Sequence, residues 1–326
     1  MRNKVSRRDF MKGAAIVAAT GVLAGCGGTS APSSPANSNS TKPENPSSSG
    51  SSSSSSSSST TIEKPTLSGW KYRKLTDDTI AISGYTQKLS ANITIPDTID
   101  KFKVVWIDKR AFAENENIAS VVIPKSVQKI DEAAFYKCKN LQSVSLPEGI
   151  IEIGDCAFGD CYALTKIRLP ESLSLLGIGA FEGCIKLKTI NIPHKLKRLS
   201  AMTFEDCTEL TDIEWTEGLE EISLSVFKWC TSLKRVILPN GIKRIHSTAF
   251  ADSSDSELEY IYIPKSIEVI GNEGNTWFGA AFIGCKKLKA IYYEGSKEEW
   301  ENLKGRYIYG TGQVIYNAKP SDVPNT

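Results

Sequence analysis

Cysteine and histidine are the residue types in this sequence that could carry nucleophilic or metal chemistry. Of the 326 residues, 8 are cysteines and 2 are histidines, at His194 and His246. Six of the cysteines follow a phenylalanine by three residues, and none forms the C-x₂-C cluster typical of zinc sites. The spacing therefore disfavours a zinc site, and we expect both histidines to be solvated.

Motifs that would indicate catalysis are missing from the sequence. It contains no G-x-S-x-G, H-E-x-x-H, phosphate loop or dinucleotide fingerprint. Carboxylate pairs such as Asp212 with Glu214 do occur, but charged residues on an exposed strand are ordinarily solvated. We therefore predict that the protein is not an enzyme and that it uses neither a cofactor nor a metal.

The phenylalanines that precede the cysteines belong to a repeat of 23 residues. They stand at Phe112, Phe135, Phe158, Phe181, Phe204, Phe227 and Phe250, with an eighth at Phe282. A fixed period of this length is typical of a solenoid, because one coil cannot bury its own apolar edge and must stack. We predict a mainly β solenoid of about eight coils, in which Phe fills the centre and Cys a tight corner.

Each repeat should contribute two short strands and one turn. In LPEGIIEIGDCAFGDCYALTKIRL, residues 146–169, alternation places Ile167 and Leu169 inward and Lys166 and Arg168 outward. A second short strand follows the proline, and we expect the Ala-Phe segment to form a single helical turn. Stacked in this way, identical residues form ladders along the interior.

These features together resemble the BspA-type leucine-rich repeat of bacterial surface proteins, over about residues 70–316. The closing segment YYEGSKEEWENL and the opening segment ISGYTQKLSANITIPDTIDKFKVVWID also resemble the ends of that family. The resemblance implies a binding module, or adhesin, for a host matrix protein or another cell's surface. That partner rests on the resemblance alone.

The N-terminus has the features of an export signal and a membrane anchor. SRRDFMK, with Arg7 and Arg8, resembles a twin-arginine signal, although Met11 stands where Leu is usual. The following apolar run is too short to span a bilayer, and an ordinary secretory signal is the alternative. The run ends in LAGC, which resembles a lipobox, so Cys26 is the expected site of lipidation. We predict an exported lipoprotein, anchored in the membrane through Cys26 and displayed on the cell surface.

The charge of the chain bears on its partners, and its composition divides it into segments. Without the first 25 residues, 34 basic and 36 acidic residues remain of the original 39 and 37, which gives no indication of nucleic-acid binding. A Ser-rich tether should follow Cys26. We predict a monomer with a signal peptide at 1–25, lipidated Cys and tether at 26–63, N-terminal cap and first coil at 64–112, repeats at 113–291, and C-terminal cap and tail at 292–326.

The cysteine ladder could in principle form disulfides, since neighbours one coil apart are close enough. Its regular repetition instead indicates packing, so we predict reduced thiols. Cys156 lies outside the ladder and is predicted to be unpaired.

Departures from the repeat mark places where the surface changes. Trp215 and Thr216 replace a strand aliphatic and a proline, and NEGNTWFG is inserted before Phe282. Insertions in solenoids loop out on one face, often the functional one. The alternative, which we favour, is that Trp277 and Phe278 plug the C-terminal cap.

One group of outward strand residues has the composition of a binding surface. Tyrosine and arginine dominate interaction hot spots, and they gather in the C-terminal half of the outer columns. The predicted ligand-binding residues are Arg235, Ile237, Tyr260, Tyr262 and Tyr292. Ordinary cross-strand packing is the alternative for this patch. The competing functions are a glycan-binding or cell-envelope scaffold lipoprotein and an accessory domain of an enzyme.

Overall fold

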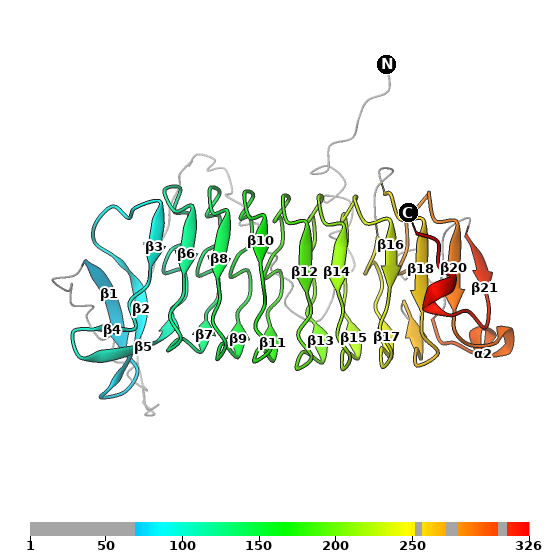
Figure 1. Ribbon diagram of the computed structural model, residues 1–326, viewed down its shortest axis with the longest axis horizontal. Helices are drawn as coiled ribbons and strands as arrows, with labels where there is room; N and C mark the ends of the chain where they lie inside the picture. Colours follow the sequence, from blue (N-terminus) through cyan, green and yellow to red (C-terminus); the bar gives the residue numbers. More distant parts are fainter. Residues whose placement is uncertain (1–68, 252–255, 272–279, 306–311, 326) are drawn as a thin grey trace, which may run out of the picture. The chain divides into compact units, whose positions relative to one another are not determined.

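Two rows of short, mostly parallel strands run along the stack of coils, one on each face (Figure 1). The main face carries β3 (Asn92–Thr94), β6 (Ser120–Val122), β8 (Ser143–Ser145), β10 (Lys166–Ile167), β12 (Thr189–Asn191), β14 (Asp212–Glu214), β16 (Arg235–Ile237), β18 (Tyr260–Ile263), β20 (Ala290–Tyr293) and β21 (Gln313–Ile315). The second face carries β5 (Phe102–Ile107), β7 (Lys129–Ile130), β9 (Glu152–Ile153), β11 (Leu175–Leu176), β13 (Arg198–Leu199), β15 (Glu221–Ile222), β17 (Arg244–Ile245) and β19 (Val269–Ile270).

The structure, a computed structural model, describes residues 69–251, 256–271, 280–305 and 312–325. The chain divides into two units, Met1–Ser55 and Ser56–Thr326, and all described residues belong to the second. That unit is a mainly β solenoid of about 10 turns with a 23-residue period, which confirms the predicted fold class. The count exceeds the eight expected because turns at both ends carry no phenylalanine of the ladder.

In the turn around each phenylalanine, two residues have a left-handed backbone conformation. The segment is therefore not the helical turn that we expected. Around Phe135, Ala133 has φ 54° and Lys137 has φ 58°, and the same positions recur in the neighbouring coils. The turns are joined by backbone bonds between coils, such as Phe135 N–H donating to Ala157 O at 2.8 Å. Because these positive φ values cost energy in non-glycine residues, the ladder of inter-coil bonds must hold them.

The core is a continuous stack of aromatic rings. Consecutive phenylalanine ring centroids lie between 4.9 Å, for Phe112–Phe135, and 5.7 Å, for Phe181–Phe204. Tyr85 continues the stack at the N-terminal end, 5.9 Å from Phe112. As predicted, Ile167 and Leu169 point inward, with 7% and 1% of their surface exposed.

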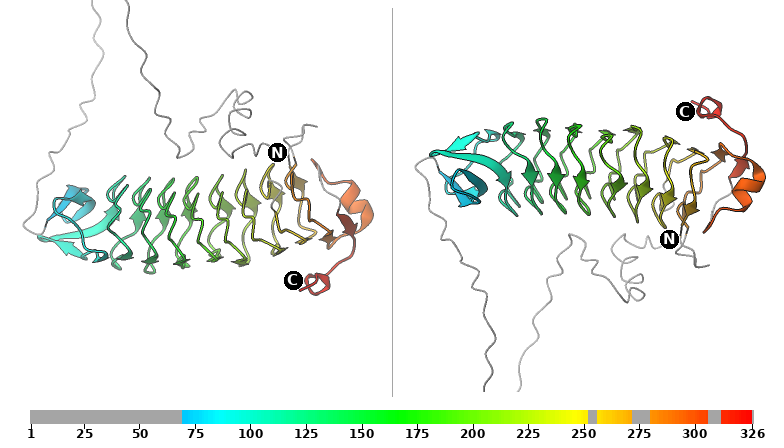
Figure 2. Two further views of the ribbon diagram at one scale, coloured as in Figure 1. Left: turned by 90° about the horizontal axis from the view of Figure 1, so that it is seen from above. Right: turned by 90° about the horizontal axis from the view of Figure 1, so that it is seen from below.

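Each end of the solenoid is closed by a different cap, as Figure 2 shows. The N-terminal cap is formed by β1 (Trp70–Lys74), β2 (Thr79–Tyr85) and β4 (Thr98–Ile99). The C-terminal cap contains α2 (Lys297–Glu301), where Trp300 packs 5.0 Å from Tyr293, and the 3-10 turn η2 (Pro320–Asp322). The predicted plug residues Trp277 and Phe278 lie outside the described residues. None of the helices described is long and apolar enough to cross a membrane.

The strand ladders are interrupted at two places. Both faces lose their pairing between the fourth and fifth full coils, at β10/β12 and β11/β13. There the side chain of Asn191 replaces the missing ladder, because its Nδ2 donates to Leu169 O at 2.8 Å and its Oδ1 accepts from Leu169 N–H at 2.9 Å. We refer to this place as the junction. The main-face ladder breaks again between β14 and β16. Trp215 follows directly after the end of β14.

Candidate functional site

The five predicted binding residues come together on adjacent strands of the main face. Arg235 pairs with Tyr260, and Ile237 pairs with Tyr262, which in turn pairs with Tyr292. The rings of Tyr260 and Tyr292 lie edge to face, with centroids 6.3 Å apart. The repeat therefore placed these residues correctly in sequence order and in register.

The surface they form is not open, however, because the C-terminal tail, residues 317–325, lies across it. Tyr262 is 2% exposed and Tyr292 is 9% exposed, and both pack in one cluster with Ala318 and Val323. The expectation that these two tyrosines face solvent is wrong. Their pattern in the strands is outward, but the repeat carries no signal that a distant segment returns to cover them.

The tail is fixed by backbone bonds as well as by apolar contact. Asn317 N–H donates to Gly295 O at 2.9 Å, and Ala318 N–H donates to Tyr293 O at 3.0 Å. Burial raises the pKa of Tyr262 to about 12, and the neighbouring carboxylate of Glu294 adds to the effect. Tyr262 therefore stays a neutral hydrogen-bonding group under the tail at physiological pH.

The main face stays uncovered from β3 to β14 among the described residues. Its outward side chains there are mostly short and polar, and several are exposed, as at Ser143, Ser145 and Lys166. The one large apolar group is Val122, which is 44% exposed. Arg168 and Glu214 form an ion pair of 3.0 Å across the junction, above the tucked-in Asn191.

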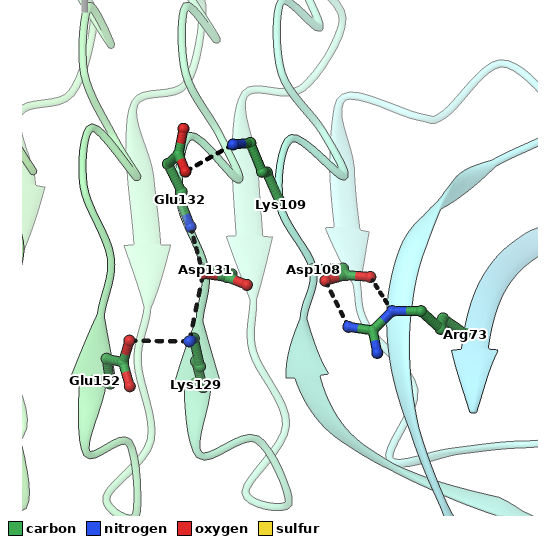
Figure 3. A network of polar contacts seen from close by, with 7 residues as sticks. All are labelled: Arg73, Asp108, Lys109, Lys129, Asp131, Glu132 and Glu152. Carbon is green, nitrogen blue, oxygen red and sulfur yellow. Dashed lines mark hydrogen bonds and ion pairs between the residues drawn. The ribbon is translucent and has the colours of Figure 1, made fainter. Parts of the chain in front are cut away.

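The second face of the N-terminal coils carries a network of charges, drawn in Figure 3. Arg73 of β1 donates two bonds, of 2.9 and 3.0 Å, to Asp108, which directly follows β5. Lys129 lies 3.0 Å from Glu152 of the following coil and 3.4 Å from Asp131. Opposite charges alternate from coil to coil, so the network joins neighbouring coils.

Each histidine contacts a carboxylate instead of being surrounded by solvent alone. His194 Nδ1 lies 2.8 Å from Glu171, and His246 Nε2 lies 2.8 Å from Glu221. In both pairs the two residues come from adjacent coils. No group of three or more His, Cys, Asp or Glu residues within the described part of the chain is arranged to hold a metal ion.

The cysteine ladder is bonded to the phenylalanine ladder, which the sequence did not reveal. Each thiol donates to the backbone carbonyl of a phenylalanine in the preceding coil, as Cys184 does to Phe158 O at 3.3 Å. The six free cysteines are all buried, at Cys138, Cys161, Cys184, Cys207, Cys230 and Cys285. Burial raises the pKa of Cys138 to about 12, so the thiol keeps its proton and is unreactive. The prediction of reduced thiols is confirmed for these six. The prediction that Cys156 is unpaired is wrong, because Cys156 is disulfide-bonded.

Two buried carboxylates straddle the junction on the turn side. Burial raises the pKa of Glu182 to about 7, and repulsion from Glu205 and Asp160 adds to it. Glu205 is 4% exposed and is neutralised by Lys228, whose Nζ lies 2.8 Å from it. The Lys228 ammonium thus compensates the buried charge of Glu205 within the fold.

Comparison with known proteins identifies the repeat. The model of the BspA type leucine rich repeat region matches residues 105–201 and 153–289, in six copies. The chain belongs to the BspA-type leucine-rich repeat family. The model of the twin-arginine translocation signal sequence matches residues 4–24, which indicates export. Arg7, Arg8 and Cys26 all lie outside the described residues.

Solved structures similar to this BspA-type chain are also leucine-rich repeat proteins. A leucine-rich repeat protein of T. pallidum is 28% identical, with 52% of this chain and 90% of that chain covered and a TM-score of 0.42. A leucine rich cell surface protein of Faecalibacterium prausnitzii is 21% identical, with coverages of 78% and 100% and a TM-score of 0.32. A leucine-rich repeat protein of Bacteroides ovatus is 22% identical, with coverages of 76% and 75% and a TM-score of 0.37. The search of curated proteins found no match.

Proposed function

We propose that this chain is a surface-displayed lipoprotein whose solenoid binds an extracellular protein, such as a host matrix protein or a protein of another cell's surface. Membership of the repeat family supports a binding or adhesin-like module. The observation that carries the proposal is the uncovered main face from β3 to β14, a long and mostly polar surface with Val122 exposed on β6, its second strand. In this proposal the chain is not an enzyme, since its sequence carries none of the catalytic motifs named above.

The predicted patch keeps a smaller role in this proposal. Arg235, Ile237 and Tyr260 remain partly exposed beside the tail and lie at the end of the uncovered face. They would form one edge of the contact with the protein ligand. Tyr262 and Tyr292 would act indirectly, by holding the tail in place.

Anchoring through Cys26 and export by Arg7 and Arg8 are tested separately from binding. Mass spectrometry of the mature N-terminus should find a diacylglycerol on Cys26, and Cys26→Ser should move the protein from the membrane to the soluble fraction. Replacing both arginines by lysine should stop export. Persistence of Cys26→Ser in the membrane would remove the lipoprotein part of the proposal and leave the binding part intact.

Binding is tested with a matched pair of surface variants. The full chain in detergent is applied to immobilised fibronectin, laminin and collagen, beside Val122→Arg on the main face and Leu175→Arg on the second face. These two residues are equally suited to change, because they are 44% and 49% exposed. We expect Val122→Arg to weaken binding at least tenfold and Leu175→Arg to leave it unchanged. Equal loss in both variants, or no binding of the wild type to any of these proteins, would contradict the proposal.

A further inference from the structure

A polar cavity lies where the main-face ladder breaks between β14 and β16, beside the C-terminal tail. Its volume is about 350 Å³. That volume is within the range of roughly 300–1,000 Å³ found for small-molecule sites. It is lined by Thr211, Asp212, Ser232, Lys234, Arg235 and Asn325. Every lining side chain carries a hydrogen-bonding group, so the cavity suits a ligand with several polar groups.

The two cationic side chains of the cavity lack an acidic partner among the described residues. Nε of Arg235 is buried and has no hydrogen-bond partner, and its Nη2 makes only a long bond of 3.5 Å to Val323 O. Neither Arg235 nor Lys234 takes part in an ion pair with any described residue. A buried guanidinium nitrogen without an acceptor is costly, and a carboxylate that reached Nε and the adjacent nitrogen would satisfy both.

The ladder break explains why Arg235 has no partner in the protein. Asp212 and Arg235 occupy the same outward column of consecutive coils, where a continuous ladder would set them side by side. Because β14 and β16 do not pair, the two charges both line one cavity instead. Asp212 accepts a bond of 2.9 Å from the Thr211 hydroxyl and keeps its other oxygen for a ligand.

We propose that this cavity binds a uronic acid unit of an acidic polysaccharide. The sugar carboxylate would lie against Arg235 and Lys234, and its hydroxyl groups would donate to Asp212 and Asn325. An acidic protein side chain fits less well, because its carboxylate offers no hydroxyl donor to Asp212. This inference goes beyond the proposed protein ligand and does not depend on it. The cavity shares Asp212 and Arg235 with the end of the proposed protein-binding face, but Val122 is not part of its lining.

Calorimetric titration of the full chain in detergent provides the test. The probes are tri-galacturonic acid, its methyl ester, which has the same shape without the charges, and a tri-glutamate peptide of the same charge. We expect binding of the acid and at least tenfold weaker binding of both the ester and the peptide. Equal affinity for acid and ester, preference for the peptide, or no binding of the acid would each overturn the proposal.

Variants connect that binding to the cavity. Lys234→Gln and Asp212→Asn should each weaken binding of tri-galacturonic acid at least fivefold, whereas Lys186→Gln, an exposed lysine elsewhere, should have no effect. Arg235→Lys keeps a cation below the tail and should lose binding with little change in Tm. Val122→Arg should bind the sugar normally, which separates this site from the proposed protein-binding face. Binding that survives both Lys234→Gln and Asp212→Asn would place the sugar elsewhere and overturn the assignment.

Discussion

The coils before the junction and the coils after it share one core but present different surfaces. Before it, both faces have continuous ladders from β3 to β10 and from β5 to β11, and their outer side chains are open. After it, the main face breaks once more and its last strands are covered by the chain's own tail. Single departures from the repeat, such as Asn191 and Trp215, accompany these breaks. In a solenoid the ladder of identical core residues can therefore stay intact while the surface changes its role.

The largest expected effect tests whether the two regions do share one core. Phe158→Ala and Phe204→Ala each remove a fully buried ring from the stack, one on each side of the junction. Each should lower the free energy of unfolding by about 3–5 kcal/mol, through lost burial and the cavity left behind. Urea unfolding measures both. A loss for Phe204→Ala of less than half that for Phe158→Ala would show that the core, and not only the surface, is looser after the junction.

The second prediction concerns the carboxylate that lies at the junction itself. The pKa of Glu182 is raised from 4.5 to about 7 by burial, with Glu205 and Asp160 adding repulsion. A raised folded-state pKa gives stability that is complete below about pH 4.5 and is lost as the pH rises through 7. The wild type should therefore lose on the order of 3 kcal/mol relative to Glu182→Gln over that interval.

Unfolding measured at a series of pH values provides the test of that prediction. Glu217→Gln, which changes an exposed carboxylate, serves as the control and should follow the wild-type curve. Parallel curves for the wild type and Glu182→Gln would mean that burial and the neighbouring carboxylates do not raise the pKa of Glu182.

Much of this fold follows from the sequence, because the ladder residues repeat in type as well as in position. Phe158 and Cys161 recur at fixed offsets, so their place at the centre and corner of each coil is set by the period alone. The covering of Tyr262 by Val323 could not be foreseen, because the contact joins a repeat to a segment that has no repeat pattern. The hydrogen bonds of the thiols and of the Asn191 side chain could not be predicted either, since both are made to backbone groups whose positions the sequence does not show.

The third prediction concerns Asn191, whose side chain replaces the strand ladder that is broken at the junction. Asn191→Ala leaves the N–H and C=O of Leu169 without the partners that they have at 2.9 and 2.8 Å. Unsatisfied buried groups should cost about 1–3 kcal/mol, and hydrogen exchange at the Leu169 amide should accelerate. Ser145→Ala, an exposed position in the same outward column before the junction, is the matched control and should change neither quantity. Unchanged exchange in Asn191→Ala would show that the junction is held by the turns alone.

The smallest expected effect compares the charge networks of the two regions. Lys129 of the first region lies 3.0 Å from Glu152, and its Nζ also lies 5.1 Å from the Trp106 ring centroid. In the second region the corresponding pair is Arg198 with Glu221, at 4.0 Å. Exposed ion pairs contribute at most about 1 kcal/mol, so Lys129→Met should cost roughly 0.5–1 kcal/mol and Arg198→Met less than half of that. The difference should shrink in 1 M salt, because screening weakens exposed pairs. A larger cost for Arg198→Met than for Lys129→Met would contradict this prediction. It would show that the tighter inter-coil charge network lies after the junction.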